Sequence, residues 1–207
     1  MPKPLILKSA AVGPWPMNTY ALICPETGQS VLIDPGADPE TLLAMLANST
    51  PIAILLTHAH HDHIGELQTM REQLNVPVYM HHADAHMLVA ADIWFAGGDD
   101  FTVGQHPLRI IHTPGHTPGM VTIMLPDQRA IVGDTIFQGG PGRTWAPQDF
   151  ATTLETLRNV VFTWPDNTQC FPGHGPSFFI GDERPAFEAF LQRGHSDDLH
   201  GDVTWEM

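Results

Sequence analysis

Residues 51–63, with the sequence PIAILLTHAHHDH, constrain the fold of this chain more than any other segment. The apolar run over 52–56 follows a proline and has the length of a buried strand. Three imidazoles and one carboxylate follow it directly: His58, His60, Asp62 and His63. In an extended stretch or a tight loop these side chains alternate in direction, and borderline-soft divalent metals favour such ligands. The segment therefore predicts a core strand whose C-terminal end carries ligands for two neighbouring metal ions.

Three further candidate ligands each lie beside a glycine, just after a predicted strand. They are His116 in TPGHTPG, Asp134 in VGDTIF and His174 in FPGHGP. Glycine lets the backbone bend sharply and approach a ligand closely, so these turns are well suited to present a metal ligand. Together with the first motif, they would complete two coordination shells.

The rest of the chain alternates between strand and helix patterns. Strands are expected over residues 5–7, 19–24, 30–34, 52–56, 76–80, 108–112, 121–125, 130–132 and 168–171. Helices are expected over 39–48 with Asp38 as N-cap, and over 64–74, 84–91, 148–161 and 181–193. Residues 96–106 are expected to form a loop over the site, and the acidic tail 195–207 is expected to be mobile. Because no repeat or linker divides the chain, we expect one domain over 1–207, with helices outside two packed sheets.

Composition narrows the classes of partner. Hydrophobic residues make up 43% and charged residues 15%, as in globular proteins. A net charge of −14 with only nine Lys and Arg argues against binding to nucleic acid or to an anionic membrane. The N-terminal segment lacks a signal-peptide apolar run, so a cytoplasmic location is the default expectation. Cys24 and Cys170 are too few for a disulfide framework and are expected to be core thiols.

The motifs THxHxDH, TPGHTPG, GDTIF and PGHGP, spread over residues 57–176, resemble those of the metallo-β-lactamase superfamily. The resemblance implies an α+β fold, a four-layer αββα sandwich of two mixed sheets flanked by helices. It also implies two divalent ions, with zinc expected and iron or manganese as alternatives. The implied ligands are His58, His60 and His116 for the first metal, and Asp62, His63 and His174 for the second, with Asp134 bridging them. Asp34, in LIDPGAD, matches another family motif and either positions the metal-binding loop or simply forms a turn.

Two such ions, about 3.5–4 Å apart, share a water, lower its pKa and present it as hydroxide, while they polarise a substrate carbonyl. Asp62 is the candidate catalytic residue that orients this hydroxide. The run GDTIFQGGPGR looks like that of glyoxalase II, a hydroxyacylglutathione thioester hydrolase, and in particular its short bacterial relatives. The resemblance implies that Arg143 binds an anionic thioester substrate, although an arginine here can also cap its own loop. The chain departs from that family at Trp145 and Pro176, where the family has tyrosines. The family's helical C-terminal glutathione-binding domain is not expected within these 207 residues.

Three alternatives remain open at this point. A persulfide dioxygenase is similar in fold and uses one iron held by two His and one Asp, which suits the same ligands. A lactone hydrolase is another enzyme with such a site. A non-catalytic metal-binding protein of this fold would be marked by a broken ligand set, whereas all seven positions are filled here. The oligomeric state is not indicated.

Overall fold

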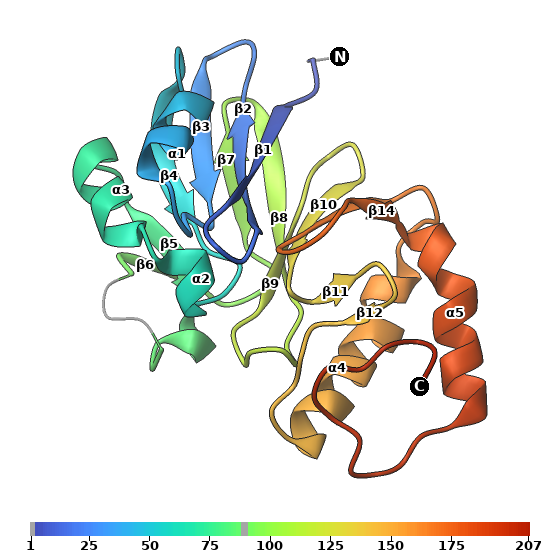
Figure 1. The fold of residues 1–207 in the computed structure, drawn as a ribbon. Helices are drawn as coiled ribbons and strands as arrows, with labels where there is room; N and C mark the ends of the chain where they lie inside the picture. Colours follow the sequence, from blue (N-terminus) through green and yellow to red (C-terminus); the bar gives the residue numbers. More distant parts are fainter. Residues whose placement is uncertain (1–2, 88–90) are drawn as a thin grey trace.

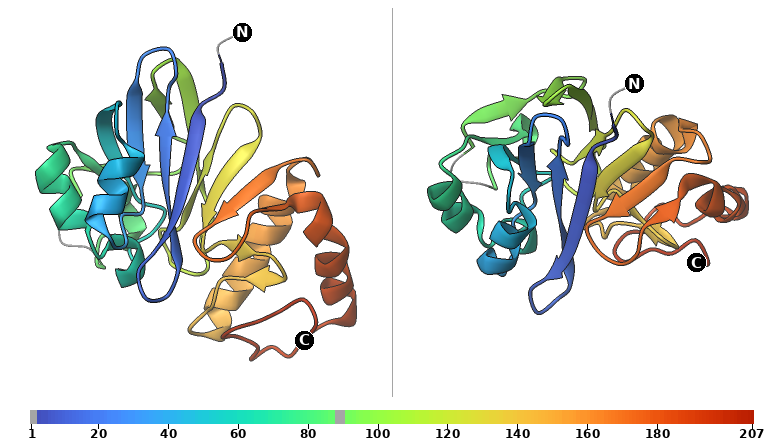
Figure 2. Two further views of the ribbon diagram at one scale, coloured as in Figure 1. Left: turned by 45° about the horizontal axis from the view of Figure 1, so that its top comes forward. Right: turned by 90° about the horizontal axis from the view of Figure 1, so that it is seen from above.

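Two six-stranded β-sheets pack face to face, and helices cover the outer face of each (Figures 1 and 2). The computed structural model describes residues 3–87 and 91–207. The first sheet has the strand order β1-β2-β3-β4-β5-β6 and consists of β1 (Ile6–Val12), β2 (Met17–Ile23), β3 (Gln29–Ile33), β4 (Thr50–Leu55), β5 (Val78–His81) and β6 (Ile93–Phe95). The second has the order β14-β13-β10-β9-β8-β7 and consists of β7 (Asp100–Val103), β8 (His106–His112), β9 (Val121–Met124), β10 (Arg129–Gly133), β13 (Gln169–Pro172) and β14 (Phe178–Phe179).

The helices lie outside this pair of sheets, and a short hairpin extends from the second sheet (Figure 1). The α-helices are α1 (Pro39–Met45), α2 (His61–Ile64), α3 (Leu67–Leu74), α4 (Pro147–Asn159) and α5 (Ile180–Arg193). The hairpin pairs β11 (Ile136–Phe137) with β12 (Gly140–Pro141). Short 3-10 helices span His82–Asp84 and Val161–Thr163.

Three clusters of buried apolar side chains hold the four layers together. The central cluster lies between the sheets and joins Leu22 and Leu55 of the first to Ile110 and Ile131 of the second. The two outer clusters lie between the first sheet and helices α1 and α3, and between the second sheet and helices α4 and α5. Strands β3 to β6 run parallel to one another, and the interior ones are buried on both faces, as their continuous apolar runs predict. This is the four-layer αββα sandwich of two mixed sheets that the sequence predicts.

The prediction for residues 96–106 is wrong. Residues 100–103 form strand β7, which pairs antiparallel with β8 at the edge of the second sheet. Phe101 packs against the central cluster, so this segment contributes to the core. The two glycines and two aspartates over 97–100 do favour a turn, but that turn ends at the start of β7.

The tail over 195–207, which we expected to be mobile, instead packs against the outer cluster of the second sheet. Val203 and Trp205 are both 3% exposed. The Trp205 ring lies 5.3 Å from Phe187 and 5.9 Å from Phe190, measured between ring centroids, and its Nε1 donates to Glu183 Oε2. The acidic residues of the tail suggested that it is solvated, but the two apolar residues between them are buried in the core.

Two helix predictions also differ from the structure. Over 84–91, the chain forms a 3-10 helix ending at Asp84 and then a turn, and residues 88–90 lie outside the described part of the chain. The buried Asp84 carboxylate accepts hydrogen bonds from Thr117 Oγ1 and Gly119 N, so it anchors a distant loop instead of starting a helix. Helix α1 ends at Met45, earlier than predicted, and the Asp38 side chain at its N-cap accepts from Gly13 N instead of capping the helix.

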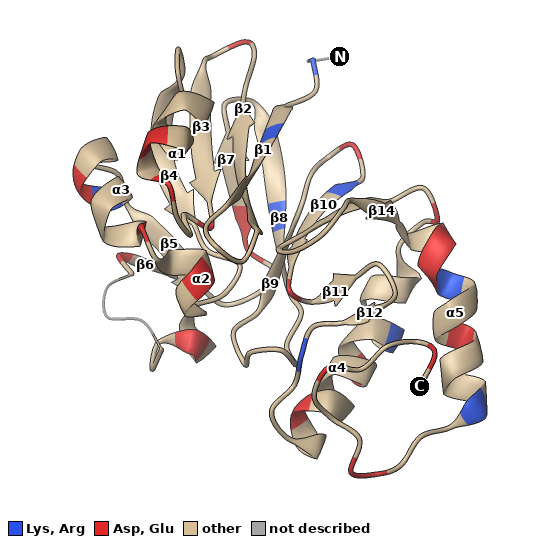
Figure 3. Cartoon of the chain, in the orientation of Figure 1, with Lys and Arg blue, Asp and Glu red and all other residues tan. Residues whose placement is uncertain are grey.

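Charge is distributed without a basic surface in the part of the chain that the structure describes. Figure 3 shows the Lys and Arg positions scattered over several elements, among more numerous acidic ones. Within the same residues, no helix is long and apolar enough to cross a bilayer.

Candidate metal centre

The seven predicted ligands come together at one end of the sandwich, in the loops that follow four strands. The first motif follows β4, and its second half forms the single helical turn α2. His116 lies in the loop between β8 and β9, Asp134 directly after β10, and His174 in the loop after β13. Because β10 and β13 are parallel neighbours with Gly133 opposite Pro172, the two strand ends bring Asp134 and His174 to the same place.

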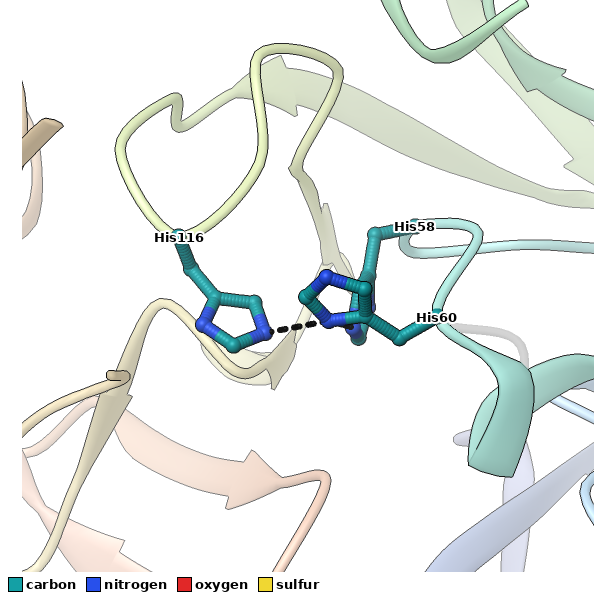
Figure 4. A group of neighbouring side chains, drawn as sticks. All are labelled: His58, His60 and His116. Atoms are coloured by element: carbon teal, nitrogen blue, oxygen red, sulfur yellow. Dashed lines mark hydrogen bonds between the residues drawn. The ribbon is translucent and has the colours of Figure 1, made fainter. Parts of the chain in front are cut away.

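Three imidazole nitrogens form the first group (Figure 4). His60 Nδ1 lies 3.1 Å from His58 Nε2 and 2.8 Å from His116 Nε2. Two nitrogens bound to one zinc ion at about 2.0–2.1 Å and at a tetrahedral angle lie about 3.3 Å apart. The three nitrogens therefore point at one another across a space close to that which a single metal ion fills.

The second group contains Asp62, His63 and His174. Asp62 Oδ2 lies 3.1 Å from His174 Nε2 and 3.9 Å from His63 Nε2. All three atoms lie within 4.8 Å of one another, so they surround one candidate metal position. The two groups are adjacent, since the His58 and His63 rings are 4.1 Å apart between centroids.

Asp134 lies between the two groups. Its Oδ2 is 3.4 Å from His116 Nε2 of the first group and 3.8 Å from His174 Nε2 of the second. Its Oδ1 is 3.3 Å from His63 Nε2. A carboxylate in this position reaches ligands of both groups at once, which is the arrangement expected of a bridging ligand.

Hydrogen bonds on the outer side of the rings select the tautomer that a metal requires. His116 Nδ1 donates to the Arg143 carbonyl at 2.7 Å, and His174 Nδ1 donates to the Pro16 carbonyl at 3.0 Å. His58 Nδ1 lies 3.1 Å from Thr57 Oγ1, which can accept because its own proton goes to a carboxylate. A ring that donates from Nδ1 keeps its Nε2 lone pair free to face inward.

Asp34 positions the metal-binding loop, which decides between the two interpretations of its motif. The parallel pairing of Ile33 with Leu55 sets Asp34 beside the start of that loop. Its Oδ1 accepts from Thr57 N at 2.8 Å, and its Oδ2 accepts from Thr57 Oγ1 at 2.6 Å and from His63 Nδ1 at 3.0 Å. This buried carboxylate therefore holds His63 by its outer nitrogen and orients His58 through the threonine.

The electrostatics of the centre fit cation binding. Burial lowers the pKa of His58 well below its usual range, and that of His60 to about 4, so both rings are neutral as ligands must be. Burial opposes protonation of His63 too, but two neighbouring carboxylates, Asp134 first, raise its pKa to about 10. Burial disfavours the Asp134 carboxylate, but His63 and the other imidazoles outweigh this and lower its pKa. An ionised carboxylate thus sits among imidazoles.

Two buried polar atoms at the centre have no hydrogen-bond partner among the described residues: His63 Nε2 and Asp134 Oδ1. They face each other at 3.3 Å without a hydrogen bond of good geometry, an arrangement that proteins rarely bury without a reason. A divalent cation between them would satisfy both. The donor set, the spacing and these two atoms together fit a pair of divalent metal ions.

Two clefts open onto the centre, and both are lined by His116, Asp134 and Arg143. One, of about 670 Å³, continues toward the β11–β12 hairpin and Trp205. The other, of about 660 Å³, runs between Trp15 and Trp145. The Arg143 guanidinium lies over the Trp145 ring at 4.8 Å, and its Nη1 is 3.4 Å from Asp202 Oδ2. None of residues 96–106 lines either cleft.

Three further groups shape this site: Thr57, which the motif THxHxDH includes without a role, and Trp15 and the Pro16 carbonyl, which no motif includes. Thr57 stands directly before the first ligand, and a hydroxyl there is a signal that could have been used. Trp15 is 78% exposed in the turn between β1 and β2, where an exposed large apolar ring is unusual. The Pro16 carbonyl carried no signal, because a backbone oxygen is present at every position.

Comparison with known proteins agrees with this arrangement. The sequence model of the metallo-β-lactamase superfamily matches residues 12–174. The probable metallo-hydrolase YqgX of Bacillus subtilis is 33% identical over 204 residues, covering 86% of this chain and 96% of that protein. Hydroxyacylglutathione hydrolase GloC of Haemophilus influenzae is 27% identical over 187 residues, covering 79% of this chain and 88% of that protein.

Solved structures show the same fold. The BLEG-1 B3 metallo-β-lactamase matches with a TM-score of 0.80 and 32% identity, over 87% of this chain and 97% of that one. TTHA1623 in a di-iron-bound form matches with a TM-score of 0.75 and 30% identity, over 86% of this chain and 96% of that one. ETHE1 from Myxococcus xanthus matches with a TM-score of 0.78 and 28% identity, over 89% of this chain and 84% of that one. The sequence match over most of the chain and the shared αββα fold show that this protein belongs to the metallo-β-lactamase superfamily of metal-dependent hydrolases.

Proposed function

We propose that this protein hydrolyses thioesters of the hydroxyacylglutathione type with a dinuclear metal centre. The observation that carries the proposal is the position of Asp134 between two groups of three ligands, at the meeting point of two clefts. The relative GloC, a hydroxyacylglutathione hydrolase, supports the thioester class.

We assign the first metal to His58, His60 and His116, the second to Asp62, His63 and His174, and the bridge to Asp134. We propose zinc, and the di-iron-bound form of TTHA1623 supports iron as an alternative, with manganese as a third. When bound, two divalent ions lower the pKa of a shared water and polarise a carbonyl oxygen. The chain's own contribution is to fix the ligand positions, through the outer hydrogen bonds described above.

Asp62 is our candidate for orienting the attacking water. Its side chain is 37% exposed and lines the cleft between the tryptophans, so a carboxylate oxygen is accessible from the substrate side. The hydrogen bond from His174 is the main reason why the pKa of Asp62 lies below its usual range, so the group is an acceptor at neutral pH. When the water donates a hydrogen bond to the Asp62 carboxylate, a lone pair on the water oxygen points away from Asp62, toward the substrate carbon.

Different groups lining the two clefts bind different parts of a thioester substrate. Trp15 and Trp145 provide apolar rings 78% and 58% exposed at the rim of one cleft, where an acyl or carrier chain can pack. Arg143 faces both clefts and offers a planar cation to a substrate carboxylate. A thiolate leaves readily without a general acid, so this set of residues is sufficient for a thioester. We therefore propose a small anionic thioester as substrate.

The decisive experiment offers glutathione, coenzyme A and other thiol esters to zinc-, manganese- and iron-loaded protein, with Asp134→Ala as the inactive control. We expect turnover of a glutathione thioester and a loss of at least 100-fold in the variant. A chromogenic β-lactam belongs in the same panel because BLEG-1 is a β-lactamase. A glutathione thioester left intact by every metal form, or turned over equally by the variant, would overturn the proposal.

A second candidate function is the persulfide dioxygenase reaction on a single iron, favoured by the likeness to ETHE1. Metal analysis of protein purified without added metal separates the two candidates. At the seven ligands of the centre, two metals and no oxygen uptake support the hydrolase, whereas a single iron with oxygen uptake on a persulfide supports the dioxygenase. A small lactone tests the remaining hydrolase alternative.

The role of Arg143 has its own test. Its guanidinium is 53% exposed and shares its charge with Asp202, so its interaction with substrate is that of a partly solvated ion pair. We expect Arg143→Gln to raise KM for anionic thioesters about tenfold with kcat nearly unchanged. The matched variant Asp202→Asn frees the guanidinium, and KM should fall. If KM moves in neither variant, Arg143 only caps its loop.

A further inference from the structure

A second cluster of metal-ligating side chains lies at the other end of the sandwich. It consists of Cys24, directly after β2, Glu26 in the following turn, and His106 at the start of β8. Strand β2 begins at Met17, which lines a cleft of the catalytic centre, and runs away from it. At about 3.3 Å per residue, this strand separates the cluster from the centre by about 20 Å. In Figure 1 the turns after β2 and between β7 and β8 lie at the top, away from the loops that carry the catalytic ligands.

The distances within the cluster match a coordination shell. Glu26 Oε2 lies 3.4 Å from Cys24 Sγ and 3.7 Å from His106 Nε2, and all three atoms lie within 4.8 Å of one another. For a tetrahedral zinc ion with bonds of about 2.3 Å to sulfur and about 2.0–2.1 Å to nitrogen and oxygen, the ligand atoms lie about 3.3–3.6 Å apart. Both distances from Glu26 are therefore close to those of a shared metal ion.

A buried nitrogen in the cluster is left without a partner. His106 is 5% exposed, and its Nε2 forms no hydrogen bond with any residue that the structure describes. That atom lies 3.7 Å from Glu26 Oε2, too far for a good hydrogen bond, and within 4.8 Å of Cys24 Sγ. Proteins rarely bury an imidazole nitrogen in this way unless something binds it.

The charges of the cluster suit a divalent cation. Without metal, the Cys24 thiol donates a hydrogen bond to Glu26 Oε2, so the sulfur already faces the carboxylate. The thiolate is the form that binds metal. Once the thiol proton has left, Cys24 and Glu26 together carry two negative charges, which match one divalent cation.

The cluster is held rigidly by both sheets. Gly104, in the turn between β7 and β8, packs so closely on Cys24 that an added Cβ would lie 2.3 Å from Sγ. The same glycine donates its N–H to Gln29 Oε1 of β3, at 3.0 Å. These contacts fix the turn that carries His106 against the turn that carries Cys24, so the ligands are positioned before any metal arrives.

We propose that Cys24, Glu26 and His106 form a third metal site, which binds one zinc-like divalent cation and links the two sheets at the end remote from catalysis. On binding, the thiol proton is released to solvent as the metal–sulfur bond forms. Glu26 is exposed, so water could supply a further ligand to an ion held by these three residues. Because the site joins residues 24 and 106, the bound ion restrains a long segment of the unfolded chain, and metal loading should raise the Tm.

Cobalt titration of the full chain tests this directly, since a cobalt–thiolate bond gives near-ultraviolet charge-transfer absorption. The ligands assigned to the catalytic centre include no sulfur, so such absorption reports on the third site alone. We expect it in the wild-type protein and in Asp134→Ala, with its loss in Cys24→Ser. The matched control is Cys170→Ser, which changes a buried free cysteine that lies in none of the ligand clusters found among the described residues.

Because a core cysteine variant can fail to fold, Glu26→Gln is the second test. It removes the charge at the surface and leaves the core intact, so the apparent Kd for cobalt, measured from the same absorption, should rise at least tenfold while thioester turnover is unchanged. The proposal is overturned if wild-type protein shows no thiolate absorption, if Cys170→Ser removes it, or if Glu26→Gln binds cobalt as tightly as the wild type. None of these results depends on which substrate the catalytic centre hydrolyses.

Discussion

Gly173 is the position at which one methyl group should disrupt the metal centre. A Cβ added there would lie 2.1 Å from Asp134 Oδ1 and 2.6 Å from His63 Cε1. To reach ordinary contact at 3.4 Å, Asp134 Oδ1 has to move from 2.1 Å, a shift of about 1.3 Å. The backbone of Gly173 is not in the left-handed region, so alanine suits its conformation and only the contact changes.

We expect Gly173→Ala to lower kcat/KM about 100-fold and to weaken the binding of the second metal at least tenfold. A misplacement of about 1 Å in a reacting group costs on the order of 100-fold in rate. Disturbing the support of a ligand costs about 10–100-fold in metal affinity. The assay strips the protein with a chelator, restores zinc by titration against a fluorescent competitor, and then measures thioester turnover.

Gly175→Ala is the matched control in the same loop. Its φ is +77°, so alanine strains the backbone, but no atom lies within 4 Å of the added Cβ. We expect it to lose about 1–2 kcal/mol of stability while keeping both metals. Wild-type metal affinity and turnover in Gly173→Ala would refute the close contact with Asp134, and equal metal loss in Gly175→Ala would show that loop strain is the cause.

Three further predictions concern the surroundings of the centre. Asp34→Asn cannot accept all three hydrogen bonds, so zinc affinity should fall about 10–100-fold by competition titration, and unchanged affinity would contradict the role of Asp34 in positioning His63. The pKa of His63 is raised to about 10, so metal binding must displace its proton, and zinc affinity should rise about tenfold per pH unit between pH 7 and 9. Calorimetry in buffers of different ionisation enthalpy should show the release of one proton. A zinc affinity that does not change with pH would argue against His63 as a ligand. Trp205→Ala removes a buried ring from the tail and should cost about 3–5 kcal/mol in urea unfolding, whereas a loss under about 1 kcal/mol would mean that the tail contributes little.

Much of the site could be predicted because its ligands carry local signals. The first motif follows a buried strand, and each of His116, Asp134 and His174 stands beside a glycine at a strand end. Strand ends and tight turns are properties of short segments, so they are visible without the fold. The wrong predictions concern segments whose polar composition hid a packed role. The strand β7 and the buried Trp205 are examples, since burial depends on distant residues that no local window contains.

The role of Asp34 and the cluster around Cys24 could not be predicted from the sequence. The sequence was compatible with Asp34 either forming a turn or supporting the metal-binding loop, and it indicated only a core thiol at Cys24. Hydrogen bonds from Thr57 and His63 decided the first, and the approach of His106 across more than 80 residues of chain revealed the second.

By itself, the sequence determined the superfamily, the αββα fold class and the identity of the candidate ligands, because these rest on residue types at fixed local spacings. Only the tertiary structure decided which nitrogen of each imidazole faces inward, that Asp134 reaches both ligand groups, and that a thiol, a carboxylate and an imidazole meet at the far end. The physical reason is that coordination and hydrogen bonding act over a few ångströms in space, and distances of that size between remote residues are set by how the two sheets pack.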